Sequence, residues 1–481
     1  METEKWYKNA LMLNRDPCWY RGTIDDSSAE ACRKSLVEYF SLYEGAVTDI
    51  CLCVFEQTAL FPSRHFMWRG DKYLQKEENG HPVDYTNEPE KNLYKCFIEY
   101  NVDAVQIFID QMHKLGIRPW LAFRMNDAHF GADPTAFNRS DMFYEEIAAG
   151  HGIGEQYGYF AKCFDFRYPR YRTALLQVIG EVLERYDFFG LELDFMRECH
   201  CFDYRNDPEC HKIMTGYIRE IRALVTEAEK RVGHDIKLSI RTCRSPRDAM
   251  AFGFDIQTLV SEKLVDLVIP TPRWSPTDSG IPIREWCELL GDKAAVFGGI
   301  ETNNRFDTIN TAEHAKAYAA AFYAQGADGI YFNNHEYYTD RNRASWQITR
   351  ESCLRGKREF VVTHQDLTAY EEWRYNPFPV VLNGENHLTL EVGKIKAEDK
   401  VTVFIDFEGE MLPTLTACDK QGIADTEVNP IILPTRVKEV VLTPHRPIAY
   451  DVSGISTESS LPLTFSGTGK VWYVNVMIDA E

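Results

Sequence analysis

The sequence of 481 residues lacks the features of a membrane protein or of a small disulfide-stabilised fold. It contains no uncharged apolar run long enough to cross a bilayer. Residues 1–6 have neither the basic start nor the apolar segment of a signal peptide. The 13 cysteines are odd in number, and several, such as Cys51 and Cys53, lie inside apolar segments. We therefore expect reduced core thiols in a cytoplasmic protein rather than a disulfide framework.

The chain has fewer basic residues than acidic ones. The chain has 53 lysines and arginines against 73 aspartates and glutamates, which gives a net charge of −20. Such a surface repels phosphate backbones and anionic lipids, so neither nucleic acid nor a membrane is an expected partner. A neutral small molecule such as a sugar is compatible with it. The length favours two domains, and 44% hydrophobic residues are enough to bury a large core.

Up to about residue 362, short apolar runs alternate with amphipathic helical stretches. The predicted strands are 10–13, 48–55, 118–123, 190–194, 236–241, 265–269, 294–300 and 329–332. The helices predicted after them are 29–43, 102–115, 171–186, 211–232, 255–263, 283–290, 312–325 and 343–353. Eight strands, each followed by a helix, predict an α/β fold of the (β/α)8 TIM barrel type. A doubly wound open sheet is the alternative, but no glycine-rich phosphate turn follows the first strand.

The pattern changes after about residue 365. The segments 388–392, 401–405, 437–442 and 471–477 are predicted strands, with almost no helix between them. We therefore predict a barrel catalytic domain over 1–362 and an appended C-terminal β-sandwich domain over 363–481. The second domain could bind sugar, pack against the barrel or make the chain a homo-oligomer.

The fourth predicted strand carries two carboxylates. Glu192 and Asp194 are two residues apart and therefore share one face of the strand. Acidic residues on a core strand are costly to bury unless they are paired or functional. Arg124 and Arg241 lie on the inward faces of the neighbouring strands, so we expect a buried Arg–Glu–Arg cluster in which Glu192 and Arg241 are structural. Asp194 would then be free to meet a substrate at the mouth of the barrel.

A second carboxylate, Glu301, ends the seventh predicted strand, which we expect opposite the fourth. Two carboxylates across a cleft can cleave a glycosidic bond: one protonates the leaving oxygen, and the other attacks the anomeric carbon or activates water. The predicted catalytic pair is therefore Asp194 and Glu301, with the roles open, and Asp127 or Glu336 could replace either. The residues predicted to bind substrate are Arg15, Asp16, Glu56, Arg124, Asn126, Asp127, Arg273, Trp274, Asn334, His335 and Glu336.

Aromatic and basic side chains at the same strand ends suit a sugar ligand. Trp274 is the best candidate to stack on a pyranose ring, and Trp19, Trp68 and Phe130 lie in flanking loops where core packing is the alternative. Three arginines at the strand ends could also bind a sugar that carries a negative charge. They are Arg15, Arg124 and Arg273.

A metal site was the main rival interpretation. Residues 198–201 and 209–211 bring three thiols and two imidazoles into one loop, from which a zinc site could be drawn. Neither group has the usual C-x₂₋₄-C spacing, so we predict no metal and no other cofactor. His129 and His335 are expected to make hydrogen bonds rather than to coordinate a metal.

Two segments resemble a known group of proteins. Residues 189–197, FGLELDFMR, resemble the strand-four signature of barrel glycoside hydrolases, in particular the "glycosyl hydrolase-like" proteins with a D-G-x-E-L-D-[FW]-x-R segment. Residues 326–333, GADGIYFN, are similar to the A-G-A-D-G-[IL]-Y-x-F-N stretch of the same group. The resemblance covers the predicted barrel and implies a hydrolase-type fold and a carbohydrate substrate.

The segment also resembles the family 18 chitinase motif D-G-x-D-x-D-x-E, but Met196 stands where that motif has its catalytic glutamate. The resemblance therefore disfavours substrate-assisted chemistry. In the large retaining clan of glycosidases, an acid at the end of strand four works with a glutamate at the end of strand seven. Asp194 and Glu301 match those places, although the Asn-Glu pair usual on strand four is absent.

The hypothesis is a cytoplasmic enzyme that hydrolyses a glycosidic bond in a small saccharide or glycoside. One alternative is a lyase or metal-dependent hydrolase that uses His129, His335 and the Cys–His loop. The other is a sugar-binding barrel without catalysis, in which the carboxylates only hydrogen-bond the ligand.

Overall fold

The structure is a computed structural model. It describes residues 5–15, 24–45, 47–85, 88, 90–272, 280–301, 311–333, 348–363, 378–427 and 446–480. The chain divides into two compact units. One comprises residues 12–270 and 288–296, and the other comprises residues 1–11, 271–287 and 297–481.

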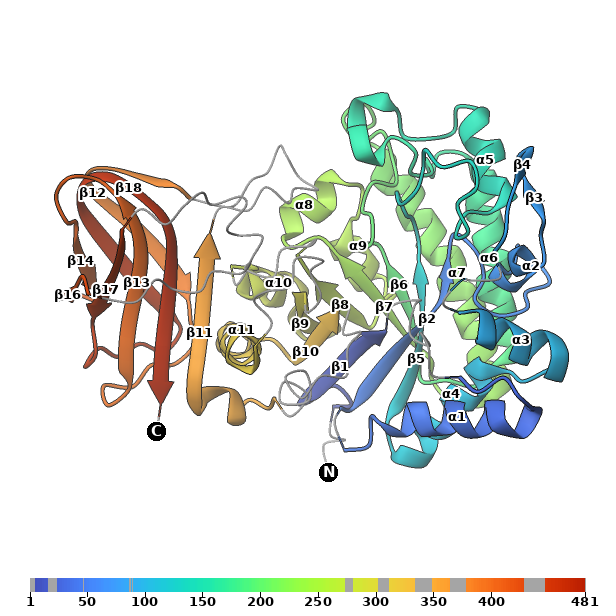
Figure 1. The fold of residues 1–481 in the computed structure, drawn as a ribbon, viewed down its shortest axis with the longest axis horizontal. Coiled ribbons are helices and arrows are strands. Elements are labelled where there is room, and N and C mark those ends of the chain that lie inside the picture. Colours follow the sequence, from blue (N-terminus) through green and yellow to red (C-terminus); the bar gives the residue numbers. More distant parts are fainter. Residues whose placement is uncertain are drawn as a thin grey trace. The chain divides into compact units, whose positions relative to one another are not determined.

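Eight parallel strands form a closed barrel (Figure 1). They are β1 (Ala10–Arg15), β2 (Asp49–Glu56), β5 (Arg118–Arg124), β6 (Gly190–Asp194), β7 (Lys237–Thr242), β8 (Leu267–Pro270), β9 (Ala295–Glu301) and β10 (Gly329–Asn333). Their order around the barrel is β1-β10-β9-β8-β7-β6-β5-β2. Each strand is almost wholly buried, as expected where helices cover the outside and side chains fill the inside. The predicted (β/α)8 barrel is therefore confirmed.

Helices separate the barrel strands along the chain. They include α1 (Ala29–Ser41), α4 (Ala104–Leu115), α6 (Pro169–Arg185), α7 (Cys210–Val232), α8 (Pro246–Ala251), α9 (Ile256–Ser261), α10 (Ile283–Leu290) and α11 (Ala312–Ala324). Helix α4 shows how the sequence sets such bounds. The Asp103 carboxylate accepts hydrogen bonds from the first free amides, and Gly116 ends the helix in the left-handed region. One apolar face of α4 is buried, as its periodicity predicts.

Two loops that the sequence suggested were long contain further short elements. The first holds α2 (Arg69–Tyr73), the hairpin of β3 (Glu77–Glu78) and β4 (His81–Pro82), and α3 (Lys91–Tyr100). The second holds α5 (Asp141–Ala148) and the 3-10 helix η1 (Glu155–Phe160). The predicted helix 343–353 lies mostly outside the described residues. Its described part, 348–353, contains no α-helix and leads into the 3-10 turn η3 (Ser352–Leu354).

The amino-terminal ends of the strands are joined by a buried polar cluster. The Asp49 carboxylate accepts hydrogen bonds from Arg118 Nε (2.7 Å), Trp120 Nε1 (2.8 Å) and the Thr48 hydroxyl (2.6 Å). The Trp120 indole also explains the glycine that opens the strand-four segment. A Cβ atom on Gly190 would lie 2.3 Å from the Trp120 ring, so the neighbouring strand can carry no side chain there.

The C-terminal region is all-β, as predicted. Its strands are β11 (Gly356–Thr363), β12 (Val380–Glu391), β13 (Lys400–Glu408), β14 (Thr414–Ala417), β15 (Lys420–Gln421), β16 (Ile423–Asp425), β17 (Pro447–Asp451) and β18 (Ser460–Ala480). They form one antiparallel sheet around β18. The first half of β18 pairs with β12 and β14, and the second half pairs with β11 and β13. The predicted strand 437–442 lies outside the described residues.

The predicted domain boundary between residues 362 and 363 falls inside β11. This strand pairs with β18 along its whole length. The division into domains 1–362 and 363–481 stays a prediction.

One cysteine prediction is wrong. Cys32 of α1 and Cys96 of α3 form a disulfide across 64 residues of sequence. Both cysteines lie on buried helix faces, and no local spacing pattern predicts a disulfide between residues so far apart in sequence. The other described cysteines are free thiols, most of them buried, which agrees with the expected core role. A cytoplasmic location stays a prediction. None of the described helices is both long and apolar enough to cross a membrane.

Candidate functional site

Asp194, the last residue of β6, is buried and held by several donors. Its Oδ1 atom accepts hydrogen bonds from the backbone amides of Met196 (2.9 Å) and Arg197 (3.0 Å). Arg241 of β7 donates from Nη1 to Oδ1 at 2.9 Å and to Oδ2 at 3.0 Å. Asp194 therefore has several protein partners, and its contact with a substrate stays a prediction. The turn after β6 folds back onto the carboxylate, and the register of β6 and β7 sets Arg241 beside it.

Glu192 lies two residues before Asp194 on the same strand and is fully buried. Asn14 of β1 donates to its Oε1 atom at 2.8 Å. The Cys51 thiol also bonds to Glu192, and burial together with this carboxylate raises the pKa of the thiol well above its usual value. Arg241 also forms an ion pair with Asp194, and Arg124 forms one with Glu56. The Arg–Glu–Arg cluster around Glu192 stays a prediction.

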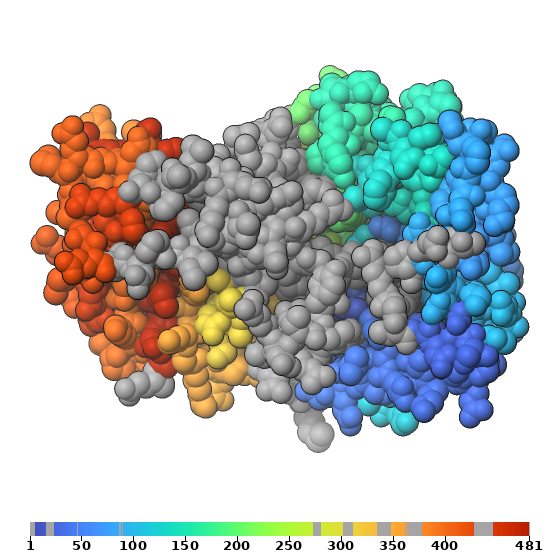
Figure 2. Space-filling view, in the orientation of Figure 1, coloured from blue at the N-terminus to red at the C-terminus, as the bar shows by residue number. Residues whose placement is uncertain are grey.

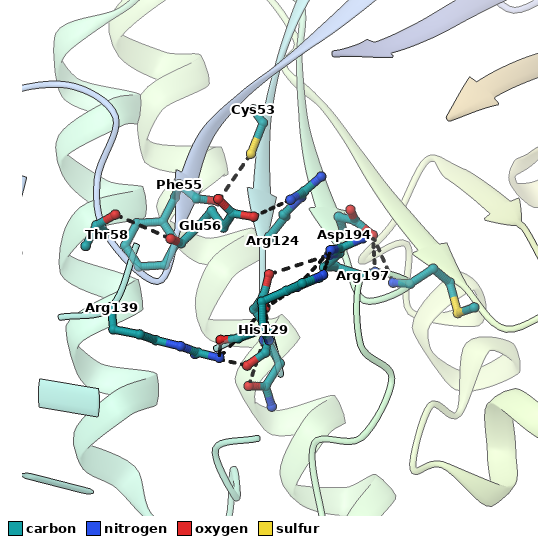
Figure 3. A network of polar contacts seen from close by, with 12 residues as sticks. Cys53, Phe55, Glu56, Thr58, Arg124, His129, Arg139, Asp194 and Arg197 are labelled. Carbon is teal, nitrogen blue, oxygen red and sulfur yellow. Dashed lines mark hydrogen bonds and ion pairs between the residues drawn. The ribbon is translucent and has the colours of Figure 1, made fainter. Parts of the chain in front are cut away.

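Glu56 ends β2 and lies beside the buried Arg124 side chain (Figure 3). Its Oε1 atom contacts Nη1 of Arg124, and its Oε2 atom accepts from Nη2 of Arg69 at 2.9 Å. Arg69 also donates from Nε to the Thr58 hydroxyl at 3.1 Å. A carboxylate shared by two arginines is a fixed charge, so Glu56 orients Arg124 at the barrel mouth.

The loop after β5 holds a second charged group. The Oδ1 atom of Asp127 accepts from the His129 backbone amide at 2.6 Å and lies 2.7 Å from His129 Nδ1. Arg197 Nε lies 3.5 Å from Asp127 Oδ2, and an Arg197 nitrogen contacts the His129 ring (Figure 3). Arg139 donates to the backbone carbonyls of Asp127 and His129. Burial alone would raise the pKa of Asp127. The attraction of His129, Arg197 and Arg139 for the carboxylate is the larger effect and holds that pKa well below its usual value.

Asn126 supports this loop rather than facing outward. It is fully buried, and its Nδ2 atom donates to the carbonyls of Phe164 (2.9 Å) and His200 (3.1 Å). Its Oδ1 atom accepts from the backbone amides of Phe164 and Asp127, both at 3.1 Å. The amide therefore ties the loops after β5 and β6 together, and we revise its predicted substrate-binding role to a structural one.

One group of side chains has the donors of a metal site. Among the residues that the structure describes, ligand atoms of Asp127, His129 and Glu198 all lie within 4.8 Å of one another, and all three residues are buried. An imidazole with two carboxylates can bind several divalent metals. However, Arg197 contacts the same histidine and aspartate, so a positive charge already lies against this group. The absence of a metal stays a prediction.

The Cys–His loop packs into apolar surroundings. The His200 ring stacks on Phe160 with 3.8 Å between centroids, and Cys199 Sγ lies 3.7 Å from His200 Nδ1. Burial raises the pKa of the Cys199 and Cys201 thiols well above the usual value, and it raises the pKa of Cys210 to about 11. These thiols are therefore protonated near neutral pH, as expected of thiols that pack in a core.

Glu301 ends β9 and is buried. Asn333, its partner in the register with β10, donates from Nδ2 to Glu301 Oε2 at 2.6 Å. In the order of the barrel, β7 and β8 separate β6 from β9, and the strand four places from β6 is β10. The expectation that Asp194 and Glu301 end opposite strands is thus corrected: their strands are three places apart.

Some of the remaining predicted residues are described by the structure, and the others lie outside the described part of the chain. Arg15 ends β1, is buried and donates from Nη2 to the Tyr39 hydroxyl at 2.5 Å. Trp68 is buried against Phe97, with 5.7 Å between ring centroids, and therefore packs the core rather than stacking on sugar. Several predicted residues lie outside the described part of the chain: Asp16, Trp19, Arg273, Trp274, Asn334, His335 and Glu336.

Four residues of the charged network and its edge were not predicted as site residues. They are Arg69, Arg139, Tyr159 and Arg197. Arg197 follows Asp194 closely in sequence, so the strand-four segment itself carried a signal for it. The others lie in loops several residues from any strand end, where no strand register could locate them.

Comparisons with known proteins give fold-level neighbours only. No protein-family model matches the sequence, and no curated protein sequence matches it. The structure aligns with three glycosidases of known structure. They are an alpha-L-fucosidase from Vibrio sp. strain EJY3 (8% identity, 98% of this chain and 97% of that one, TM-score 0.38), the chitinase ChiW from Paenibacillus sp. str. FPU-7 (8%, 96% and 56%, 0.39) and the chitinase ICChI from Ipomoea carnea (10%, 70% and 98%, 0.32). At these scores we base no functional argument on them.

Proposed function

We propose that this chain hydrolyses a glycosidic bond in a small saccharide, with Asp194 and Glu301 as the two carboxylates and without a cofactor. The proposal includes the predicted cytoplasmic location. The observation that carries it is the state of Asp194, a buried carboxylate at the carboxyl end of a barrel strand, surrounded by donors from the next strand and the following turn. Catalytic residues of such barrels lie at this end of the strands.

Asp194 is suited to the role of nucleophile. The contacts described above are all made by donors, and one of them is a guanidinium that reaches both oxygens. In a retaining mechanism a carboxylate held in this way attacks the anomeric carbon. The contacts also fix its direction, and a fixed nucleophile avoids part of the entropic cost of reaching the transition state.

Glu301 is suited to the role of acid and base. It is buried, and the donor seen on its Oε2 atom is the neutral amide of Asn333. An amide donor can bond to a carboxyl group in either protonation state. With Asp194 as the nucleophile, Glu301 would give a proton to the leaving oxygen and take one from water in the second step.

The charged residues around Asp194 would bind and orient the sugar. Arg15, Glu56, Arg124 and Asp127 remain proposed contacts to substrate hydroxyls, and the described side chains among them are held by ion pairs or hydrogen bonds. Outside the described residues, the proposed contacts are Asp16, Arg273, Trp274, Asn334, His335 and Glu336.

A hydrolysis screen against aryl α- and β-glycosides and short oligosaccharides tests the proposal. We expect Asp194→Asn and Glu301→Gln to abolish turnover with the fold unchanged, while Asp133→Asn, a change of the same kind at an exposed loop residue, keeps it. Product analysis by proton NMR should show retention of anomeric configuration, because a carboxylate nucleophile inverts the centre twice. Turnover that survives both substitutions would exclude this pair, and inversion would exclude Asp194 as nucleophile.

A metal-dependent hydrolase is the second candidate, favoured by the Asp127, His129 and Glu198 group. Metal analysis of the purified protein and activity after chelation separate the two candidates. Stoichiometric metal and activity lost on chelation would support the second. If saccharides bind but no glycoside is cleaved with or without added divalent metal, the chain is a sugar-binding barrel.

A further inference from the structure

Two aromatic rings at the edge of the charged network are largely exposed. Phe130 is 60% exposed and Tyr159 is 51% exposed, although most aromatic side chains of the described barrel unit are buried. The His129 ring lies next to both, with centroid distances of 6.1 Å to Phe130 and 6.4 Å to Tyr159. The part of the chain around residues 130–160, teal in Figure 2, reaches the molecular surface. Exposed aromatic rings beside a polar side chain offer both apolar contact and hydrogen bonds to a ligand.

The backbone at Phe130 supports this interpretation. Its φ angle is +54°, in the left-handed region that a bulky residue rarely adopts. Gly131 follows, yet the unfavourable conformation falls on the phenylalanine and not on the glycine. Such strain persists only when the surroundings impose it, and it is concentrated at functional sites. Here Arg139 contacts the carbonyl of His129, just before Phe130, and the Asp133 amide donates to the Phe130 carbonyl at 3.0 Å.

We infer that Phe130 and Tyr159 form a sugar-binding subsite with His129 and Arg197 as its polar side. A pyranose has one apolar C–H face and a rim of hydroxyls, so it matches an exposed ring beside hydrogen-bonding groups. The subsite is continuous with Asp194, because the Arg197 backbone amide donates to Asp194 Oδ1 while its side chain contacts His129. Figure 3 shows His129, Arg197 and Asp194 together. This inference rests on the proposed function and names the part of the substrate that the loops after β5 and β6 would hold.

The test compares Phe130→Ala, Tyr159→Ala and Phe130→Trp with Leu74→Ala, which removes an equally exposed apolar side chain (59%) elsewhere in the same unit. On a di- to tetrasaccharide that the wild type cleaves, we expect each alanine variant to raise KM about tenfold with kcat nearly unchanged. Phe130→Trp should keep the wild-type KM, and Leu74→Ala should have no effect. Unchanged KM in both alanine variants would overturn the subsite while leaving the proposed function intact.

Two further measurements remove the remaining ambiguity. If Phe130 served only folding, Phe130→Gly would lower the melting temperature, whereas a ligand contact predicts an equal or higher one, since glycine tolerates the positive φ. If no glycoside is cleaved, calorimetric titration with the same saccharides replaces kinetics. Binding weakened about tenfold in the alanine variants would support the subsite in a protein that binds sugar without cleaving it. Absence of binding by the wild type would overturn the subsite and the proposed function together.

Discussion

Replacing Asp127 with asparagine should destabilise the barrel unit strongly at neutral pH. The carboxylate is fully buried and balances the charges of Arg139 and Arg197, of which Arg139 is fully buried too. Removing one partner of a buried ion pair costs about 3–5 kcal/mol, because the other charge stays in a poorly solvated place. For a unit of this size we expect the melting temperature to fall by about 6–20 °C. Asparagine has nearly the same shape, so the loss reflects charge and not a cavity.

The stabilisation by the Asp127 carboxylate should depend on pH in a definite direction. The pKa of Asp127 in the folded chain lies well below its usual value, whereas in the unfolded chain it is about 3.9. The carboxylate therefore stabilises the fold above about pH 4, and the contribution is lost as the pH falls through the lower, folded-state value. The difference in melting temperature between wild type and Asp127→Asn should stay constant from pH 8 to pH 5 and narrow below about pH 4.

Differential scanning calorimetry across this pH range is the assay, with Asp133→Asn as the matched control. Asp133 lies in the same loop but is exposed, and its carboxylate bonds only to the nearby Thr135 among the contacts seen. We expect a change of less than about 1 kcal/mol for the control. A melting temperature for Asp127→Asn within 1–2 °C of the wild type at pH 7, or a gap that persists undiminished into strong acid, would refute the electrostatic account.

Three further predictions concern other parts of the chain. Arg241→Gln should lower kcat about 100-fold, because Asp194 would lose the side chain that positions it. Arg241→Lys should keep part of this activity. Steady-state kinetics on the substrate found in the screen measures kcat for both variants. Replacing both Cys32 and Cys96 with serine should cost about 2–4 kcal/mol, so urea unfolding of the wild type with and without reductant should reproduce that loss; identical curves would mean that the disulfide does not form. Burial lowers the pKa of His314 to about 3, so stability should decline as the pH falls below about 6.5, by at most about 1.4 kcal/mol per pH unit. His314→Gln should flatten that decline in urea titrations, and an unchanged slope would contradict it.

The barrel was predictable because its signal is repeated. Eight apolar segments with helical stretches between them require no knowledge of any single contact, and errors of one or two residues at each end do not change the fold. Gly190 and the carboxylates that follow it were informative for a similar reason: period-two alternation fixes which side chains share a face.

Short elements inside loops were harder to predict. Helix α3 begins at Lys91 after Glu90, which makes no capping hydrogen bond, so its start lacks the usual signal. Helix α5 follows Ser140, whose hydroxyl accepts from the Phe143 amide, and this cap could have been recognised in the sequence.

The partners of the site residues could not be read from the strands alone. Asn126 has the residue type and position of a substrate ligand, but loop conformation gives its amide four backbone partners. Arg241 was predicted beside Glu192 from its inward direction, and the structure adds an ion pair to Asp194, its partner in the register of β6 and β7. Strand register sets which residues can meet, and the loops decide which of them do.

The long strand β18 has a consequence for how the C-terminal sheet is made during synthesis. It is the last of the described strands to be translated, yet β11, β12, β13 and β14 all hydrogen-bond to it. The first of these, β11, begins at Gly356 and pairs with residues up to Ala480. These strands therefore emerge from the ribosome without their main partner, and pairing over such separations is slow. Their edges therefore stay open to wrong association until β18 is made.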